Sequence, residues 1–145
     1  MIRIVLVAAA VAFGITAVSA QSDPIAARKA LMKETGAQAG IGGKIMRGEE
    51  PFELAKAQKI FTTFEETAAK GHGLFPTTAR TGGETAALPA IWDNNADFKA
   101  KFDKLGADAK AAKASVKDLD SFKAAYPGVT RNCGGCHETY RAKRN

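Results

Sequence analysis

The chain has 145 residues, of which 46% are hydrophobic, and it carries a formal net charge of +6, so it is long enough for one folded domain. Its lysines are spread through helical patterns and form no cluster of the kind that binds nucleic acid. A structural zinc site needs four ligands, and of the two cysteines and two histidines, His72 lies far from the other three. Composition and charge therefore argue against nucleic-acid-binding and zinc-binding classes.

The first twenty residues have the pattern of a secretory signal peptide. Arg3 supplies a short basic segment, an apolar run follows over residues 4–15, and Val18-Ser19-Ala20 ends in the small residues that a signal peptidase requires. The apolar run is shorter than the ~20 residues that span a bilayer. We therefore expect residues 1–20 to be cleaved, and the mature domain, residues 21–145, to have no membrane segment.

Two amphipathic helices are predicted in the first half of the mature chain. Ser22-Asp23-Pro24 is typical of a helix start, with a capping side chain followed by proline, and apolar residues then recur every seven positions as far as Met46. The second helix is expected from about Phe52 to Lys70, where apolar residues recur at steps of three and four. Residues 71–88 hold four glycines and predict the one long loop.

Two more helices are predicted in the second half. The third begins between Pro89 and Asn95, and Asp118 is a suitable N-cap for the fourth, which continues to Tyr140. Pro127-Gly128 interrupts the last helix, but the apolar stripe keeps its phase across this point, which favours a kink or local turn over two separate helices. Four such helices without a strand signal predict an all-α fold, an antiparallel four-helix bundle.

The strongest functional signal is Cys133-Gly134-Gly135-Cys136-His137, the spacing that attaches haem covalently. On a helix, positions i, i+3 and i+4 share one face. Both thiols can therefore form thioethers along one edge of the porphyrin, and His137 lies one turn from Cys133, in reach of the iron. We expect one haem c, bound through Cys133 and Cys136, with His137 as the proximal axial ligand. Such attachment belongs outside the bacterial cytoplasm, so we expect a periplasmic protein.

Two other interpretations account for this motif less completely. A thioredoxin-like redox pair is expected in a βαβ setting, and the chain has no strand signal. A simple disulfide can form in an oxidising compartment, but it gives no reason for the histidine that follows. Haem attachment accounts for all three side chains.

A four-helix bundle that carries Cys-x-x-Cys-His on its last helix resembles the cytochrome c' family, since ordinary cytochromes c carry this motif near the N-terminus. The resemblance extends over essentially all of residues 21–145. Segments similar to the family pattern are Arg28-Lys29-Ala30-Leu31-Met32-Lys33, Leu74-Phe75-Pro76, Pro89-Ala90-Ile91-Trp92 and Cys136-His137-Glu138-Thr139-Tyr140-Arg141.

The resemblance implies that Met32 decides the function. In the low-spin branch of the family, a methionine at this position ligates the iron and the protein carries electrons. In the five-coordinate branch, an apolar residue there blocks the iron, which can bind small gases such as nitric oxide or carbon monoxide. Leu31-Met32-Lys33 followed by Gly36 is more similar to the low-spin branch, so we expect Met32 as the distal ligand. Some five-coordinate members also have a non-ligating methionine here, so the alternative of an occluding Met32 stays open.

The resemblance also assigns two arginines. It places Arg28 near a haem propionate, where a charge-assisted hydrogen bond is favourable, and Arg141 near the proximal face, where it can tune His137 through an outer contact. A solvated helix surface is the alternative for both. Met46 is expected in the core, because it lies about 21 Å further along the first helix than Met32, and His72 is expected on a surface loop.

The leading hypothesis is therefore an electron-transfer protein that is not an enzyme. A peroxidase-like activity requires acid–base groups on the distal side, and neither His72 nor a pair of carboxylates is placed to supply them. The expected partners are redox proteins of unknown identity. Dimers are common in the family, and the glycine-rich first helix is compatible with a homodimer.

Overall fold

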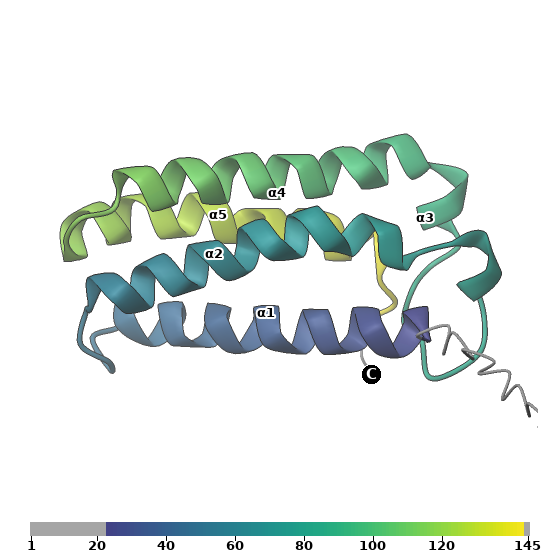
Figure 1. Cartoon of the computed structure of the whole chain (residues 1–145), viewed down its shortest axis with the longest axis horizontal. Helices are drawn as coiled ribbons and strands as arrows, with labels where there is room; N and C mark the ends of the chain where they lie inside the picture. The colour runs from purple at the N-terminus through teal and green to yellow at the C-terminus, as the bar shows by residue number, and fades with distance from the viewer. Residues whose placement is uncertain (1–22, 144–145) are drawn as a thin grey trace, which may run out of the picture.

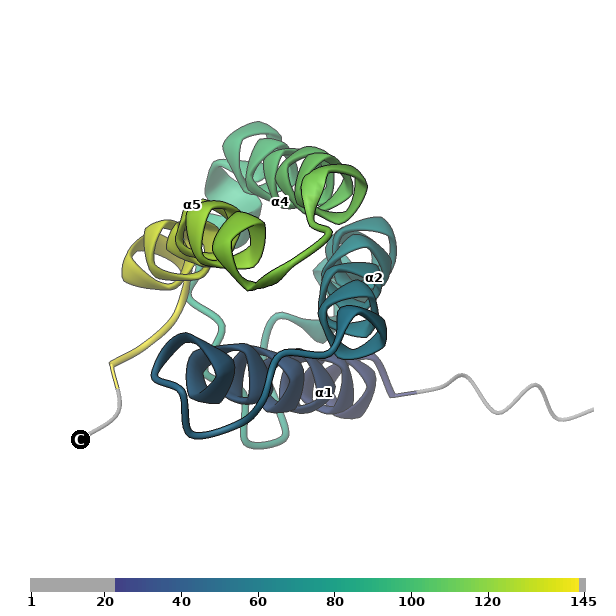
Figure 2. The same cartoon turned by 90° about the vertical axis from the view of Figure 1, so that its left-hand side faces the viewer.

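The computed structural model describes residues 23–143, and it shows four long helices packed as an antiparallel bundle (Figures 1 and 2). This confirms the expected all-α fold class. The expected signal peptide, residues 1–20, lies outside the described residues. The long helices are α1 (Pro24–Met46), α2 (Leu54–Gly71), α4 (Asn95–Ser115) and α5 (Leu119–Tyr140). The connection from α2 to α4 contains the short 3-10 helices η1 (His72–Leu74) and η2 (Thr77–Ala79) and the single-turn α3 (Ala90–Asp93).

The predicted helix starts are confirmed by their caps. The Asp23 side chain accepts a hydrogen bond from the backbone N–H of Ile25 at 2.9 Å, and Pro24 occupies the first turn. Asp118 accepts from the backbone N–H of Ser121 at 2.8 Å, and the Ser121 side chain bonds back to complete a capping box. Each cap satisfies a backbone donor that the first turn of a helix leaves without a partner.

Helix α5 runs through Pro127 as a single helix, so the alternative of two separate helices is wrong. Proline has no N–H to donate to the carbonyl four residues earlier. That carbonyl belongs to Lys123, an exposed residue, so water can replace the missing donor. The Thr130 hydroxyl donates to the Tyr126 carbonyl at 3.1 Å in the next turn.

The core is divided into two clusters at opposite ends of the bundle. The first cluster joins the N-terminal part of α2, the C-terminal part of α4 and the N-terminal part of α5, and its largest fully buried rings are Phe61, Phe64 and Phe122. The second cluster is smaller and gathers Ile91, Phe98, Phe102 and Tyr140. Within residues 23–143 no helix is long and apolar enough to cross a membrane.

Contact between α1 and α5 is concentrated near Tyr126. Its hydroxyl donates to the Ala39 carbonyl at 2.5 Å, and its ring lies against Gly42. A Cβ atom built on Gly42 would lie 2.3 Å from a ring carbon of Tyr126, so only glycine permits this approach. Toward the N-terminus of α1, the space between the two helices opens into a cavity.

Candidate functional site

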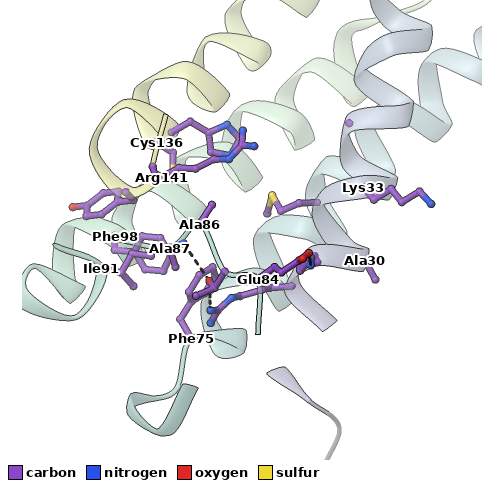
Figure 3. A pocket seen from close by; sticks show the side chains of 18 of the residues that line it. Ala30, Lys33, Phe75, Glu84, Ala86, Ala87, Ile91, Phe98, Cys136 and Arg141 are labelled. Atoms are coloured by element: carbon purple, nitrogen blue, oxygen red, sulfur yellow. Dashed lines mark hydrogen bonds and ion pairs between the residues drawn. The ribbon is translucent and has the colours of Figure 1, made fainter. Parts of the chain in front are cut away.

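The cavity between α1 and α5 has a volume of about 940 Å³, which lies in the range of small-molecule and cofactor sites. Figure 3 shows Cys136 and Arg141 on one side of it and Ala30 and Lys33 of α1 on the other. Its apolar wall is made mostly by the second core cluster. The residues of this wall are Phe75, Ile91, Phe98, Phe102 and Tyr140.

The sequence motif borders this cavity only in part. Cys136 and His137 line it, whereas Cys133 lies one turn earlier, is half-buried and is not a lining residue. Both cysteines are free thiols. Burial raises the pKa of both, and at Cys136 the nearby Lys101 ammonium opposes this rise. Both cysteines are half-buried, and Cys136 also packs against the second core cluster.

Met32 lies across the cavity from the motif. It projects from α1, is half-buried and packs against the second core cluster. Gly36, one turn further on, also lines the cavity, and a Cβ built on it would meet nothing within 4 Å. Met32 lines the cavity from α1, and His137, which is an exposed residue, lines it from α5.

Met46 and His72, the other methionine and histidine of the expected mature chain, lie away from the cavity. Met46 packs against the first core cluster at the far end of α1, as predicted. His72 is half-buried at the start of η1, where its Nε2 lies 3.2 Å from Oδ1 of Asn95. It is not among the residues that line the cavity.

Arg28 is a buried cation on the cavity wall, with only 4% of its surface exposed. Its guanidinium donates to the Ala79 carbonyl at 3.1 Å and to the Thr85 hydroxyl at 2.6 Å, and it lies 4.7 Å from the centre of the Phe75 ring. Desolvation lowers the pKa of Arg28, but a guanidinium stays charged in proteins. Its hydrogen-bond partners are neutral, and the Asp23 carboxylate acts on Arg28 through its charge alone, which opposes the fall in pKa. The guanidinium can therefore donate to an anionic group.

The end of α5 is joined to the loop that precedes α3. Backbone hydrogen bonds run from Leu88 N–H to the Tyr140 carbonyl at 3.0 Å and from Ala142 N–H to the Ala86 carbonyl at 2.8 Å. The half-buried Arg141 between them pairs with Ala87 in an isolated bridge and lines the cavity. This contact, which connects segments more than fifty residues apart, positions Arg141 beside the motif.

Tyr140 is a wall residue whose role the sequence did not reveal. Its hydroxyl donates to Oδ2 of Asp97 at 2.5 Å. Burial, together with this carboxylate, raises the pKa of Tyr140 to about 12. The hydrogen bond ties the last turn of α5 to the first turn of α4, next to Cys136.

Cationic side chains also surround the cavity mouth. Lys29 and Lys33 come from α1 and Lys143 from the C-terminal segment, while Glu84 is the one acidic lining residue. Glu84 lies 3.6 Å from the Lys29 ammonium, and this pair is exposed. The helical spacing of Lys29 and Lys33 around Met32 was the available sequence signal for this cationic mouth.

The family model for cytochrome C' matches residues 23–141. The chain belongs to the cytochrome c' family. Proteins of this family bind covalently attached haem c with its iron, and the chain is a c-type cytochrome of this kind. Three features of the cavity fit such a group. They are its apolar wall, the α5 segment that carries two free thiols and His137, and the buried cation of Arg28.

Two relatives of this cytochrome from one organism carry different names. The chain is 40% identical over 144 residues to a cytochrome c' of Rhodopseudomonas palustris, with 99% of each chain covered. It is 33% identical over 147 residues to a cytochrome c-556 of the same organism, again with 99% of each covered. Its fold is similar to the structure of cytochrome c' from Rhodopseudomonas palustris, with a TM-score of 0.83 and 42% identity over 86% of this chain and 100% of that one.

Proposed function

We propose that this cytochrome is a periplasmic electron carrier. In this proposal Cys133 and Cys136 hold the haem through thioethers, and His137 and Met32 are its axial ligands. The observation that carries it is that His137 and Met32 line the same cavity from opposite helices. When bound, the haem supplies one-electron exchange between ferric and ferrous iron, and methionine–histidine ligation gives it a raised reduction potential.

The side chains around the ligands have supporting roles in this proposal. Arg28 donates to a haem propionate, and this carboxylate replaces one of the neutral hydrogen-bond partners of Arg28. Arg141, held by the backbone contact with the loop at Ala87, orients His137 from outside the coordination sphere. Tyr140 and the phenylalanines of the cavity wall exclude water from the ring. Signal-peptide cleavage after Ala20 accounts for the periplasmic location.

Gas binding is the second candidate function. Met32 packs against the second core cluster, and this contact also suits a side chain that covers the iron without ligating it. One relative is named cytochrome c' and another cytochrome c-556, so the relatives do not separate the two candidates. In this alternative the iron is five-coordinate and binds carbon monoxide or nitric oxide.

Absorption spectra of the ferric and ferrous holoprotein, the latter with and without carbon monoxide, test the proposal. We expect sharp low-spin ferrous bands that resist carbon monoxide. Met32→Ala should convert the iron to high-spin, allow carbon monoxide to bind and lower the midpoint potential, whereas Met46→Ala should leave the spectrum unchanged. A high-spin spectrum in the unmutated protein, insensitive to Met32→Ala, would contradict ligation by Met32 and favour gas binding.

A further inference from the structure

A second cavity, of about 740 Å³, lies between α4 and α5, two helices that run side by side in Figures 1 and 2. Asn132 and Gly135 of α5 line it, while Cys136 and His137 line the first cavity. The haem-attachment segment therefore separates the two cavities, and the proposed function uses only the first.

The lining of the second cavity is cationic. Lys101 and Lys104 of α4 and Arg131 of α5 face it, and Asp108 is its one acidic lining residue. Asp108 is already engaged, because Lys104 and Asn132 each lie 2.7 Å from its Oδ2. Within residues 23–143, Lys101 and Arg131 have no carboxylate in ion-pair distance. The cavity thus carries unpaired positive charge that complements an acidic surface.

The backbone beside Cys136 is open to this side. Gly134 and Gly135 are exposed, and a Cβ built on either would meet nothing within 4 Å. Gly135 is therefore the lining residue that brings the second cavity next to Cys136 in the chain.

The mouth of the first cavity is the competing surface, because it is cationic too. There, however, Lys29 already faces Glu84, and Arg28 and Arg141 are assigned to the haem by the proposed function. Lys33 and Lys143 at that mouth have no carboxylate partner among residues 23–143, and neither do Lys101 and Arg131. The α4–α5 cavity differs in that its lining includes Gly135, next to Cys136.

We propose that the α4–α5 cavity is the docking surface for an acidic redox-partner protein, and that electrons pass through the Gly135–Cys136 main chain and the Cys136 thioether. With haem bound, one electron would move between the redox centre of the partner and the iron in either direction, and no bond would form or break. This inference rests on the proposed function, because it assigns the partner of the same haem.

The test compares two rates of reduction of the ferric holoprotein, measured by stopped flow at low ionic strength. One reductant is reduced flavodoxin, an acidic electron-transfer protein, and the other is reduced lumiflavin, a small neutral flavin that needs no docking charge. In the double variant Lys101→Glu, Arg131→Glu, the flavodoxin rate relative to the lumiflavin rate should fall roughly fivefold or more. The difference should vanish at ionic strength of about 1 M, where charges are screened within ~3 Å.

Two matched double variants provide the contrast. Lys44→Glu, Lys59→Glu makes the same charge change at exposed sites on α1 and α2 and should leave the ratio within roughly twofold. Lys29→Glu, Lys33→Glu tests the mouth of the first cavity. A larger fall in this variant than in the α4–α5 variant, or an unchanged ratio in the latter, would overturn the proposal. If Lys101→Glu, Arg131→Glu folds poorly, Lys101→Gln, Arg131→Gln gives the same comparison with smaller charge changes.

Separate measurements test the proposed function and the docking surface. The carbon monoxide spectra report the ligation of the unmutated protein before any reductant is mixed. The ratio of the two rates is measurable for five-coordinate and six-coordinate iron alike, so each result stands separately.

Discussion

Arg28 joins three distant segments through one side chain. Its guanidinium contacts Leu74, Ala79 and Thr85, which lie 46 to 57 residues away in the chain. A buried cation is costly unless its donors are satisfied, and here backbone carbonyls and a hydroxyl satisfy them without neutralising the charge. The residue therefore holds the loop over the cavity and also keeps positive charge on its wall.

The charge of Arg28 should be visible in the reduction potential. Oxidation adds a positive charge at the iron, which a nearby guanidinium disfavours, so Arg28→Met should lower the midpoint potential. Coulomb interaction at an effective dielectric constant near 20 suggests a shift on the order of tens of millivolts. Spectroelectrochemical titration measures it. Arg47→Met, the same substitution at the far end of α1 beside Glu49, should shift the potential much less, and equal shifts would contradict the placement of Arg28 beside the haem.

The sequence predicted some residues of the haem site but not the contacts that they make with distant parts of the chain. Spacing alone identified Cys136 and His137, since the motif is local. The partners of Arg28 and the hydrogen bond between Tyr140 and Asp97 arise from contacts across 43 or more residues. No local pattern records such contacts, so the sequence showed Tyr140 as the end of the last helix, within a segment similar to the family pattern, and did not show its bond to Asp97.

Helix α1 meets α5 closely where glycine allows it. The Tyr126 ring occupies the space where a side chain at residue 42 would lie, and the Tyr126 hydroxyl bonds the Ala39 carbonyl. This contact fixes the separation of the two helices at one end, and the cavity begins where the contact ends. The width of the haem site is therefore set in part by a residue pair outside it.

Two glycines of α1 should respond in opposite ways to alanine. Gly42→Ala brings a methyl group against the Tyr126 ring, and such overpacking costs on the order of 1–3 kcal/mol. A Cβ atom built on Gly40 would meet nothing within 4 Å. Gly40→Ala should therefore stabilise the folded protein by up to about 1 kcal/mol through helix propensity. Chemical denaturation of both holoproteins measures the difference. Equal effects at the two positions would show that Tyr126 does not limit the approach of α1.

The sequence predicts the long helices well and the connection between α2 and α4 poorly. The caps at Asp23 and Asp118 and the apolar periodicity predicted the four long helices, which end within about two residues of the expected positions. A single long loop was expected over residues 71–88, where the structure has η1 and η2, and α3 lies within the range expected for the start of the third helix. These short turns are held by tertiary contacts such as the bond from Trp92 Nε1 to the Phe75 carbonyl at 2.9 Å, and propensity does not determine them.

The whole molecule is packed unevenly. The first core cluster is dense and complete, with Ile60, Phe61 and Phe122 fully buried. The second cluster surrounds the cavity, and Met32, Phe75 and Cys136 pack against it only as half-buried residues. The haem ring accordingly forms part of the core at this end.

Loss of the haem should loosen one end of the bundle. A chain with Cys133→Ala and Cys136→Ala should melt at a lower temperature and less cooperatively than the holoprotein, because the apolar wall is then exposed to water. Hydrogen exchange should be faster in α1 and the last turn of α5, while amides around Phe61 and Phe122 stay protected. Calorimetry and exchange measured by mass spectrometry give these results. Melting as cooperative as that of the holoprotein would show that the ring is not part of the core.

The position of the attachment motif has a consequence for biosynthesis. Chains are made from the N-terminus, and every buried residue of the first cluster, from Ile45 to Val129, precedes Cys133. In the proposed function the chain is exported, and its N-terminal residues then also reach the periplasm before the motif does. We therefore expect haem attachment to be the closing step of maturation, which completes a partly assembled bundle and does not start one.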